Sequence, residues 1–156
     1  MATDEQISAV RDYSRAVFEA HERRSYWRDL SAEVLKVLRA RAKELKEETT
    51  TEFVVLQHGE WNELALQLGF GAQPVLRSRE GAIRAETGAT MVVNLTRNGF
   101  VRFAFFPSRI DGDRERDAEV LGEVDPFRAL DAIDQYLTMF LRRATETHWA
   151  HVKVKP

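Results

Sequence analysis

One histidine and one nearby carboxylate in the sequence could act together in acid-base catalysis. His58 and Glu60 are separated by a single glycine, after a short apolar run and before Trp61. Such a pair in one loop can exchange protons with a substrate near neutral pH. It also needs a third group that orients it, and none is visible in the sequence. We therefore interpret the segment as a loop crossing and keep a hydrolase-type enzyme as the second alternative function.

Metal and cofactor sites are not predicted. His148 and His151 are three residues apart beside Glu146, but the chain has no cysteine and zinc usually takes three or four ligands on a held scaffold. The Asp-Gly-Asp segment at 111–113 begins like a calcium loop but lacks the terminal glutamate at the required spacing. The glycines in 69–71 lack the lysine and the hydroxyl residue of a phosphate loop. We expect no cofactor.

A small-ligand site is suggested by polar residues on neighbouring predicted strands. In the register derived below, Asn94 lies opposite Arg102 on one side and opposite Glu80 on the other, with Arg84 one row further along. Two guanidinium groups and an amide on a rigid sheet can orient a carboxylate or a phosphate. An ordinary ion-paired solvent face explains the same residues. Arg84, Asn94 and Arg102 are thus the candidate residues of the first alternative, a small-ligand or nucleotide-binding protein.

Basic residues gather on one stripe of the N-terminal helical region, which is a pattern of phosphate-backbone contacts. Glutamates occur throughout the same region, and the whole chain balances 23 Lys and Arg against 25 Asp and Glu, for a net charge of −2. A mixed, solvated helix face is the expected interpretation, and nucleic acid is not an expected partner. The basic stripe consists of Lys36, Arg39, Lys43 and Lys46.

The elements that would position these residues centre on a hairpin over residues 89–106, where two β-rich runs flank Asn98-Gly99. A two-residue turn would set Leu95 opposite Arg102 and mix polar with apolar residues on each face. A three-residue turn, with Gly99 in the left-handed conformation, makes one face wholly apolar. We predict this second register. Its pairs are Leu95 with Val101, Val93 with Phe103 and Met91 with Phe105.

Residues 1–48 are predicted to be helical. Thr3 and Gln6 form a capping box, and apolar residues then recur at helical spacing in two stripes that are out of phase with one another. Because the apolar seam shifts between them, a helical hairpin or a long bent helix fits better than one straight coiled coil. The stripes are Ile7, Val10, Val17 and Phe18, and then Trp27, Leu30, Val34, Val37, Leu38 and Leu45.

Residues 52–124 are predicted to form an antiparallel meander of about five to six strands. A turn at 86–88 would set Ile83 opposite Met91, and the charged segment 111–117 should be an exposed loop. Asp125 and Pro126 begin an amphipathic helix over residues 125–145 that packs on the sheet, and the tail after it should fray. The sequence therefore predicts one α+β domain over residues 1–156.

The predicted helices carry more apolar surface than a single sheet of this size can bury. The C-terminal helix would cover the apolar face, so at least one N-terminal helix should keep exposed apolar surface, which a second chain usually buries. We expect a homodimer, or another protein partner, with Val17, Phe18 and Trp27 at the interface. With no signal peptide and no long apolar run, the chain is expected to be cytoplasmic without a membrane partner. The favoured function is a non-enzymatic protein-interaction or regulatory module acting through its N-terminal helices.

Overall fold

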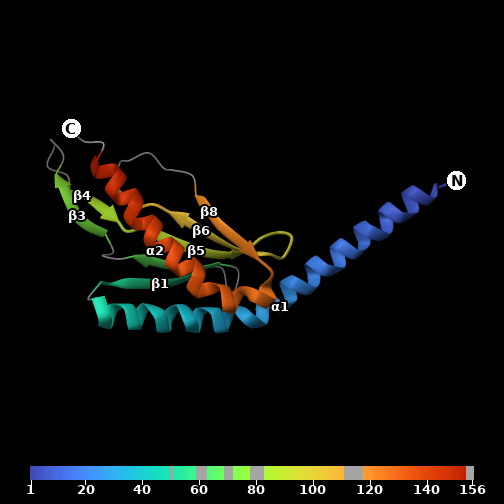
Figure 1. Ribbon diagram of the computed structural model, residues 1–156, viewed down its shortest axis with the longest axis horizontal. Coiled ribbons are helices and arrows are strands. Elements are labelled where there is room, and N and C mark those ends of the chain that lie inside the picture. The colour runs from blue at the N-terminus through green and yellow to red at the C-terminus, as the bar shows by residue number, and fades with distance from the viewer. Residues whose placement is uncertain (50, 59–62, 69–71, 78–82, 111–117, 154–156) are drawn as a thin grey trace.

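The computed structural model describes residues 1–49, 51–58, 63–68, 72–77, 83–110 and 118–153. These residues have an α+β arrangement in which the C-terminal helix packs on an antiparallel sheet (Figure 1). The elements are α1 (Asp4–Thr49), β1 (Phe53–His58), β2 (Glu63–Leu68), β3 (Ala72–Arg77), β4 (Ile83–Thr87), β5 (Thr90–Leu95), β6 (Val101–Phe106), β7 (Arg109–Ile110), β8 (Glu119–Val124), the 3-10 helix η1 (Pro126–Arg128) and α2 (Ala129–Lys153).

The described strands form two antiparallel sheets instead of the single meander of five to six strands expected from the sequence. A five-stranded sheet has the order β1-β2-β5-β6-β8, and a three-stranded sheet has the order β3-β4-β7. Gly88 and Ala89 separate β4 from β5, and Pro107 and Ser108 separate β6 from β7. Glycine offers no side chain to pack and proline offers no donor to the ladder, so both favour a break in a strand.

The central hairpin has the predicted register. Gly99 has a φ of 84°, and the backbone nitrogen of Thr96 donates to the carbonyl oxygen of Phe100 at 2.8 Å, which closes the three-residue turn. A side chain at this φ would be strained, so the glycine selects the turn and thereby the strand pairing. The predicted pairs Leu95–Val101, Val93–Phe103 and Met91–Phe105 are all present.

The second predicted hairpin, with Ile83 opposite Met91, is wrong. Ile83 pairs with Arg77 in the three-stranded sheet, whereas Met91 belongs to the five-stranded sheet. The chain does not turn back at 86–88. Instead, β4 and β5 run on in the same direction, and they pair with two consecutive strands of the returning segment: β5 pairs with β6, and β4 pairs with β7. The pairs on either side of the break are Thr87–Arg109 and Thr90–Phe106.

One face of the five-stranded sheet is covered by α2 and the second half of α1. Figure 1 shows α2 running across the sheet, with α1 alongside it at the β1 edge. Burial of apolar side chains between these layers supplies the main driving force for folding. The fully buried large side chains are Trp27, Val34, Leu38, Leu64, Met91, Val93, Val101, Phe103, Phe105, Ile133 and Phe140.

Gly122 of β8 gives Tyr136 of α2 room to reach the sheet. The Tyr136 ring stacks on Phe103, with ring centroids 4.3 Å apart and planes 15° apart. A Cβ atom on Gly122 would lie 2.2 Å from the Tyr136 hydroxyl oxygen and 2.6 Å from a ring carbon. Since these distances are shorter than van der Waals contact, any side chain at position 122 would displace the ring.

The N-terminal region forms one continuous helix, so the helical hairpin is wrong and the long helix is observed. Its predicted capping box is present: the nitrogen of Thr3 donates to Gln6 Oε1 at 2.8 Å, and the nitrogen of Gln6 donates to Thr3 Oγ1 at 3.1 Å. Figure 1 shows that the helix changes direction near the place where it leaves the sheet. The apolar seam shifts in the same region, because only the second stripe faces the sheet.

The C-terminal helical region begins as predicted and runs further. Asp125 Oδ1 accepts a hydrogen bond from the nitrogen of Phe127 at 3.0 Å, and Pro126 opens η1. The helix then continues as α2 to Lys153, beyond the predicted end at residue 145. No helix of the described residues has the length and apolar character needed to cross a membrane. The predicted loop at 111–117 and the end of the tail, 154–156, lie outside the described residues.

Candidate interaction site

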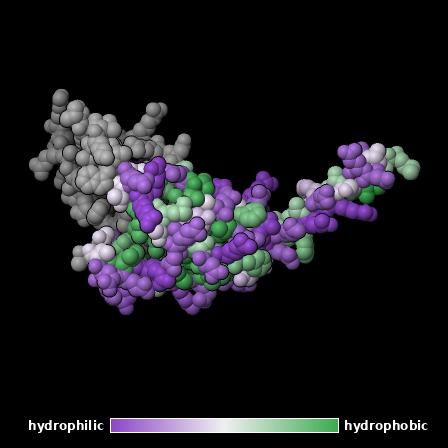
Figure 2. All heavy atoms as spheres, in the orientation of Figure 1, coloured by the Kyte–Doolittle hydropathy of each residue, from purple (hydrophilic) through white to green (hydrophobic). Residues whose placement is uncertain are grey.

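The first part of α1 extends away from both sheets as a projecting arm, defined here as residues 4–19 (Figure 1). Every residue of the arm is exposed, whereas buried residues of α1 begin only at Trp27. Figure 2 shows hydrophobic side chains beside hydrophilic ones on this arm. About 24 Å of helix, at 1.5 Å per residue, is therefore not covered by the described part of the chain.

The arm is amphipathic. An α-helix advances about 100° per residue, so its large apolar side chains occupy one broad side, while Glu5, Ser8, Asp12 and Glu19 lie on the other. The apolar side chains are 38% to 72% exposed, which leaves a continuous hydrophobic stripe in contact with solvent. The arm stripe consists of Ile7, Val10, Tyr13, Val17 and Phe18.

The base of the arm is fixed by the tip of the β5–β6 hairpin. The guanidinium of Arg23 donates to the carbonyl oxygen of Asn98 from Nε at 3.0 Å and from Nη2 at 2.7 Å. The same guanidinium lies over the ring of Phe100, with Cζ 4.3 Å from the ring centroid. Hydrogen bonds from a charged donor are stronger than neutral ones, and a cation over an aromatic ring adds attraction.

Three further contacts hold the helix at the base of the arm. A Cβ atom on Gly99 would lie 2.8 Å from Arg23 Cβ and 2.9 Å from the carbonyl oxygen of Ala20, so the hairpin backbone approaches α1 closely only because this residue is glycine. On another side, the rings of Tyr26 and Phe127 are 4.2 Å apart. Arg24 also donates to the carbonyl oxygen of Arg97. The arm is thus a continuation of an anchored helix.

The predicted interface residues divide into two groups. Val17 and Phe18 lie on the arm and are exposed, as an interface requires. Trp27 has no exposed surface and belongs to the hydrophobic core, where α1 packs on the sheet. The placement of Trp27 at the centre of an interface is therefore corrected: its indole packs within its own chain.

The three predicted ligand-binding residues are not brought together. Asn94 and Arg102 are cross-strand partners, as expected. Arg84 lies in the other sheet, opposite Leu76, and the second neighbour of Asn94 is Glu63 instead of Glu80, which lies outside the described residues. Because β4 continues into β5 without turning back, no strand places Arg84 beside Asn94.

Arg102 already has an anionic partner. Its Nε and Nη2 lie 2.9 and 2.8 Å from Glu123 Oε1, across the β6–β8 pair. A guanidinium paired in this way has fewer hydrogen-bond donors available for a ligand anion. Arg102 is therefore a weaker candidate for the predicted small-ligand site. Asn94 Oδ1 is buried and has no hydrogen-bond partner within the described part of the chain.

The histidines considered for catalysis and for metal binding lie in different elements of the fold. His58 is the last residue of β1, and Glu60 lies outside the described residues. His148 and His151 fall in the last turns of α2. Within the described ranges, no group of three or more metal-ligating side chains occurs. In the basic stripe, Lys36 forms an ion pair with Glu33 at 3.2 Å.

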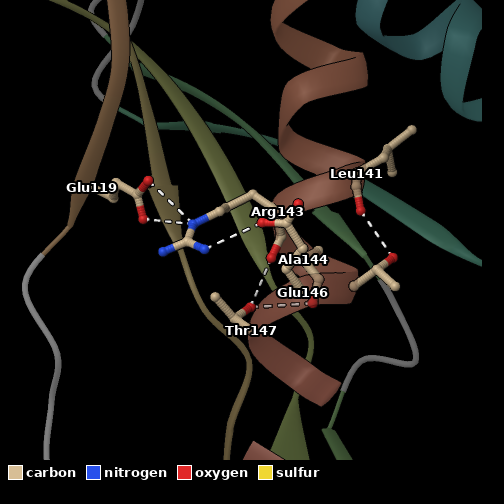
Figure 3. A network of polar contacts seen from close by, with 7 residues as sticks. Glu119, Leu141, Arg143, Ala144, Glu146 and Thr147 are labelled. Carbon is tan, nitrogen blue, oxygen red and sulfur yellow. Dashed lines mark hydrogen bonds and ion pairs between the residues drawn. The ribbon is translucent and has the colours of Figure 1, made fainter. Parts of the chain in front are cut away.

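Two arginines join α2 to its neighbours. Arg143 Nε contacts Glu119 of β8 at 2.9 Å, and Nη1 contacts Glu146 at 3.3 Å (Figure 3). Hydrogen bonds with Glu119 and then Glu146 raise the pKa of Arg143 above its usual value. Arg41 of α1 binds both carboxylate oxygens of Asp134, at 2.8 and 3.1 Å, and this hydrogen bonding holds the pKa of Asp134 below its usual value. These pairs are structural, since each cation is satisfied by its own chain.

The contact between Arg23 and the hairpin tip has little signal in the sequence. Arg23 and Asn98 are 75 residues apart, and no local pattern pairs a helix arginine with a distant turn carbonyl. Gly99 was recognisable as a turn glycine. The same residue is also where the hairpin backbone meets α1, and only the assembled structure reveals that second role.

Comparison with known proteins adds no identification. No family model matches the chain, and neither the curated proteins nor the solved structures contain a significant match.

Proposed function

We propose that the protein is a non-enzymatic cytoplasmic interaction module that self-associates through its arm. The observation that carries this proposal is the exposure of the whole apolar arm stripe on a helix that its own chain anchors only from Ala20 onward. Removing apolar surface from water is the dominant favourable term in most protein association. An anchored, preformed helix also loses less conformational entropy on binding than a disordered segment would.

The physics of isolated helices supports a partner. A helix shorter than about 12–15 residues is marginal in water, and most helical stability in proteins comes from packing of an apolar face. The arm is only slightly longer than that limit and has no packing within the described chain. A covering partner would supply the missing stabilisation, and a second copy is the commonest such partner in soluble oligomers.

The charges of the arm favour protein over membrane or nucleic acid. Arg11 and Arg15 are outnumbered by Asp4, Glu5, Asp12 and Glu19. Membrane-surface helices bind anionic lipid through an excess of basic residues, and nucleic-acid surfaces neutralise phosphates in the same way. An acidic arm would be repelled from both, so its apolar stripe suits a protein surface.

The two alternatives have weaker support. A small-ligand site at Arg84, Asn94 and Arg102 would need Arg84 from the other sheet and an arginine that already pairs with Glu123. The hydrolase alternative rests on His58 and Glu60, for which no orienting partner is known. The projecting arm requires neither rearrangement nor an additional group.

A matched pair of variants tests the proposal. Val17→Glu places a charge on the apolar stripe, whereas Ser8→Glu places the same charge on the opposite side of the arm, about 180° away. Sedimentation at micromolar concentration is expected to give a mass near twice 18.0 kDa for the wild type and for Ser8→Glu. Val17→Glu is expected to sediment as the monomer. A monomeric wild type, or equal effects of the two variants, would contradict the proposal.

A further inference from the structure

A second apolar surface is present on the face of the five-stranded sheet that points away from the helices, called here the outer face. Side chains alternate between faces along a strand, so Val92 and Ala104 point opposite to the core residues Val93 and Phe103. The register carries this apolar position through every strand of the sheet. The resulting outer row contains Leu56, Val92, Ala104 and Val120, and Ala65 occupies the paired backbone position in β2.

A polar row borders this apolar one. One register step nearer the hairpin tip, the outer face carries Asn94, Arg102 and Glu123, and His58 and Glu63 occupy the paired backbone positions in β1 and β2. On the other side lie Val54 and Phe106. The outer face therefore has a hydrophobic band with a charged rim, which is the usual anatomy of a protein interface.

The apolar band is exposed only in part, because Val92 is half-buried and Ala104 is buried at its centre. Val54, Leu56, Phe106 and Val120 are 36% to 51% exposed, although each lies in a regular strand. Both α-helices pack against the opposite face, since their buried side chains share one core cluster with Met91, Val93 and Phe103. Among the described residues, no helix covers the outer face. Apolar side chains left exposed on a regular sheet are typical of a binding surface.

The area of the arm alone is small for a stable dimer. Aromatic side chains bury about 150–250 Å² each when fully covered. Only two of the five residues of the arm stripe are aromatic, and all five are only partly exposed. They offer on the order of 500 Å² per copy on that scale, whereas a standard stable interface buries about 800 Å² per partner. Pairing of two arms by themselves falls short, and further surface must contribute.

We propose that in the dimer the arm of each copy lies on the outer face of the second copy's five-stranded sheet. This inference rests on the proposed self-association. The arm is about 24 Å long, and five strands spaced about 4.8 Å apart span roughly 19 Å, so the lengths match. The exchange is reciprocal, so two-fold symmetry closes the dimer without leaving either surface free.

The arm cannot lie on the outer face of its own sheet. Arg23 and Gly99 fix its base at the hairpin tip, and from there the arm points away from both sheets (Figure 1). Reaching its own outer face would require the helix to break and fold back around the hairpin. A second molecule meets no such constraint.

Cross-linking between single cysteines tests the contact, because the chain has no cysteine of its own. Val10→Cys marks the arm and Val120→Cys marks the outer face. The two variants are mixed, one carrying an affinity tag, and treated with a short bis-maleimide linker, which avoids the strict Cα spacing of a disulfide. The expected product is a covalent heterodimer that joins the two different variants. Absence of this product, while sedimentation still shows a dimer, would overturn the sheet contact and leave arm pairing in place.

A pair of charge substitutions provides an independent readout. Val120→Lys is expected to raise the dimer dissociation constant at least tenfold, whereas Met139→Lys, at an exposed apolar position on the helical layer, is expected to leave it unchanged. Both positions are exposed, so both variants should fold. Equal dissociation constants for the two would overturn the sheet contact. A wild type that is monomeric throughout would instead overturn self-association itself.

Discussion

The guanidinium of Arg23 donates two hydrogen bonds to the carbonyl oxygen of Asn98, at 3.0 and 2.7 Å, and so joins the base of the arm to the turn of the central hairpin. The turn carries Gly99 at a φ of 84°, which fixes the strand register. The same five-residue tip therefore determines both the pairing of the sheet and the point at which α1 leaves it. The direction of the arm is a property of the fold.

Arg23→Ala should loosen the base of the arm. The variant loses two charge-assisted hydrogen bonds and the contact with Phe100, so we expect the free energy of unfolding to fall by about 1–2 kcal/mol. Urea denaturation measures this change. Arg15→Ala, on the polar side of the arm, is the control and should change the free energy of unfolding by less than about 0.5 kcal/mol. Equal losses would show that the Arg23 contacts contribute nothing.

Two neighbouring valines of β5 should differ strongly in how much stability a polar substitution removes. Val93 is fully buried between the sheet and the helices, and Val92 faces the outer side. Val93→Asp should unfold the domain, because an unpaired buried carboxylate costs several kcal/mol. Val92→Thr should be mild. Circular dichroism and thermal melting compare the two, and similar melting temperatures would contradict the assignment of faces.

Gly122→Ala should destabilise the contact between β8 and α2. Its Cβ atom would overlap the Tyr136 hydroxyl and ring, and overpacking of this kind costs about 1–3 kcal/mol. Combining it with Tyr136→Leu, which shortens the opposing side chain, should remove most of the additional loss. A double-mutant cycle by chemical denaturation measures the coupling. Additive losses would show that the ring does not depend on the glycine.

The ion pair between Arg41 and Asp134 should stabilise the fold only when the carboxyl is ionised. Hydrogen bonding to Arg41 lowers the folded pKa of Asp134 below its ordinary value of 3.8. Its stabilising effect is therefore present above that value and is lost as the pH falls through the folded pKa. Asp134→Asn should lower stability only slightly near neutral pH, since the side chain is 63% exposed and exposed ion pairs contribute little.

The same variant should match the wild type in strongly acidic solution. Denaturation at both pH values measures the difference, with Asp131→Asn on the same helix as the control. A stability difference that does not change with pH would show that the Arg41 contact does not depend on the charge of Asp134.

The local parts of this fold were predictable from the sequence. The register of the central hairpin follows from one turn glycine and alternating apolar residues, because only one pairing separates the faces. The capping box at Thr3 was also predictable, because its two partners are only three residues apart. Such features depend on residues that are close together in the chain, and patterns in the sequence reveal such local relationships.

The long-range parts were not predictable. Ile83 was assigned to the wrong sheet because residues 86–88 suggest a turn, and only pairing with β7 shows that the chain continues. Trp27 and Phe18 have similar helical patterns, but one packs in the core and the other is exposed. Periodicity identifies an apolar stripe without identifying what covers it. Only the structure therefore shows that residues 4–19 project from the domain with their apolar stripe exposed.

Hydrogen exchange of the arm amides as a function of protein concentration measures whether the arm is covered in a dimer. If arms are covered in a dimer, amides of residues 4–19 should exchange slowly at concentrations above the dissociation constant and rapidly on dilution below it. Amides of the central hairpin should keep the same protection throughout. Fast exchange of residues 4–19 at every concentration would contradict the account, because the arm would then remain uncovered.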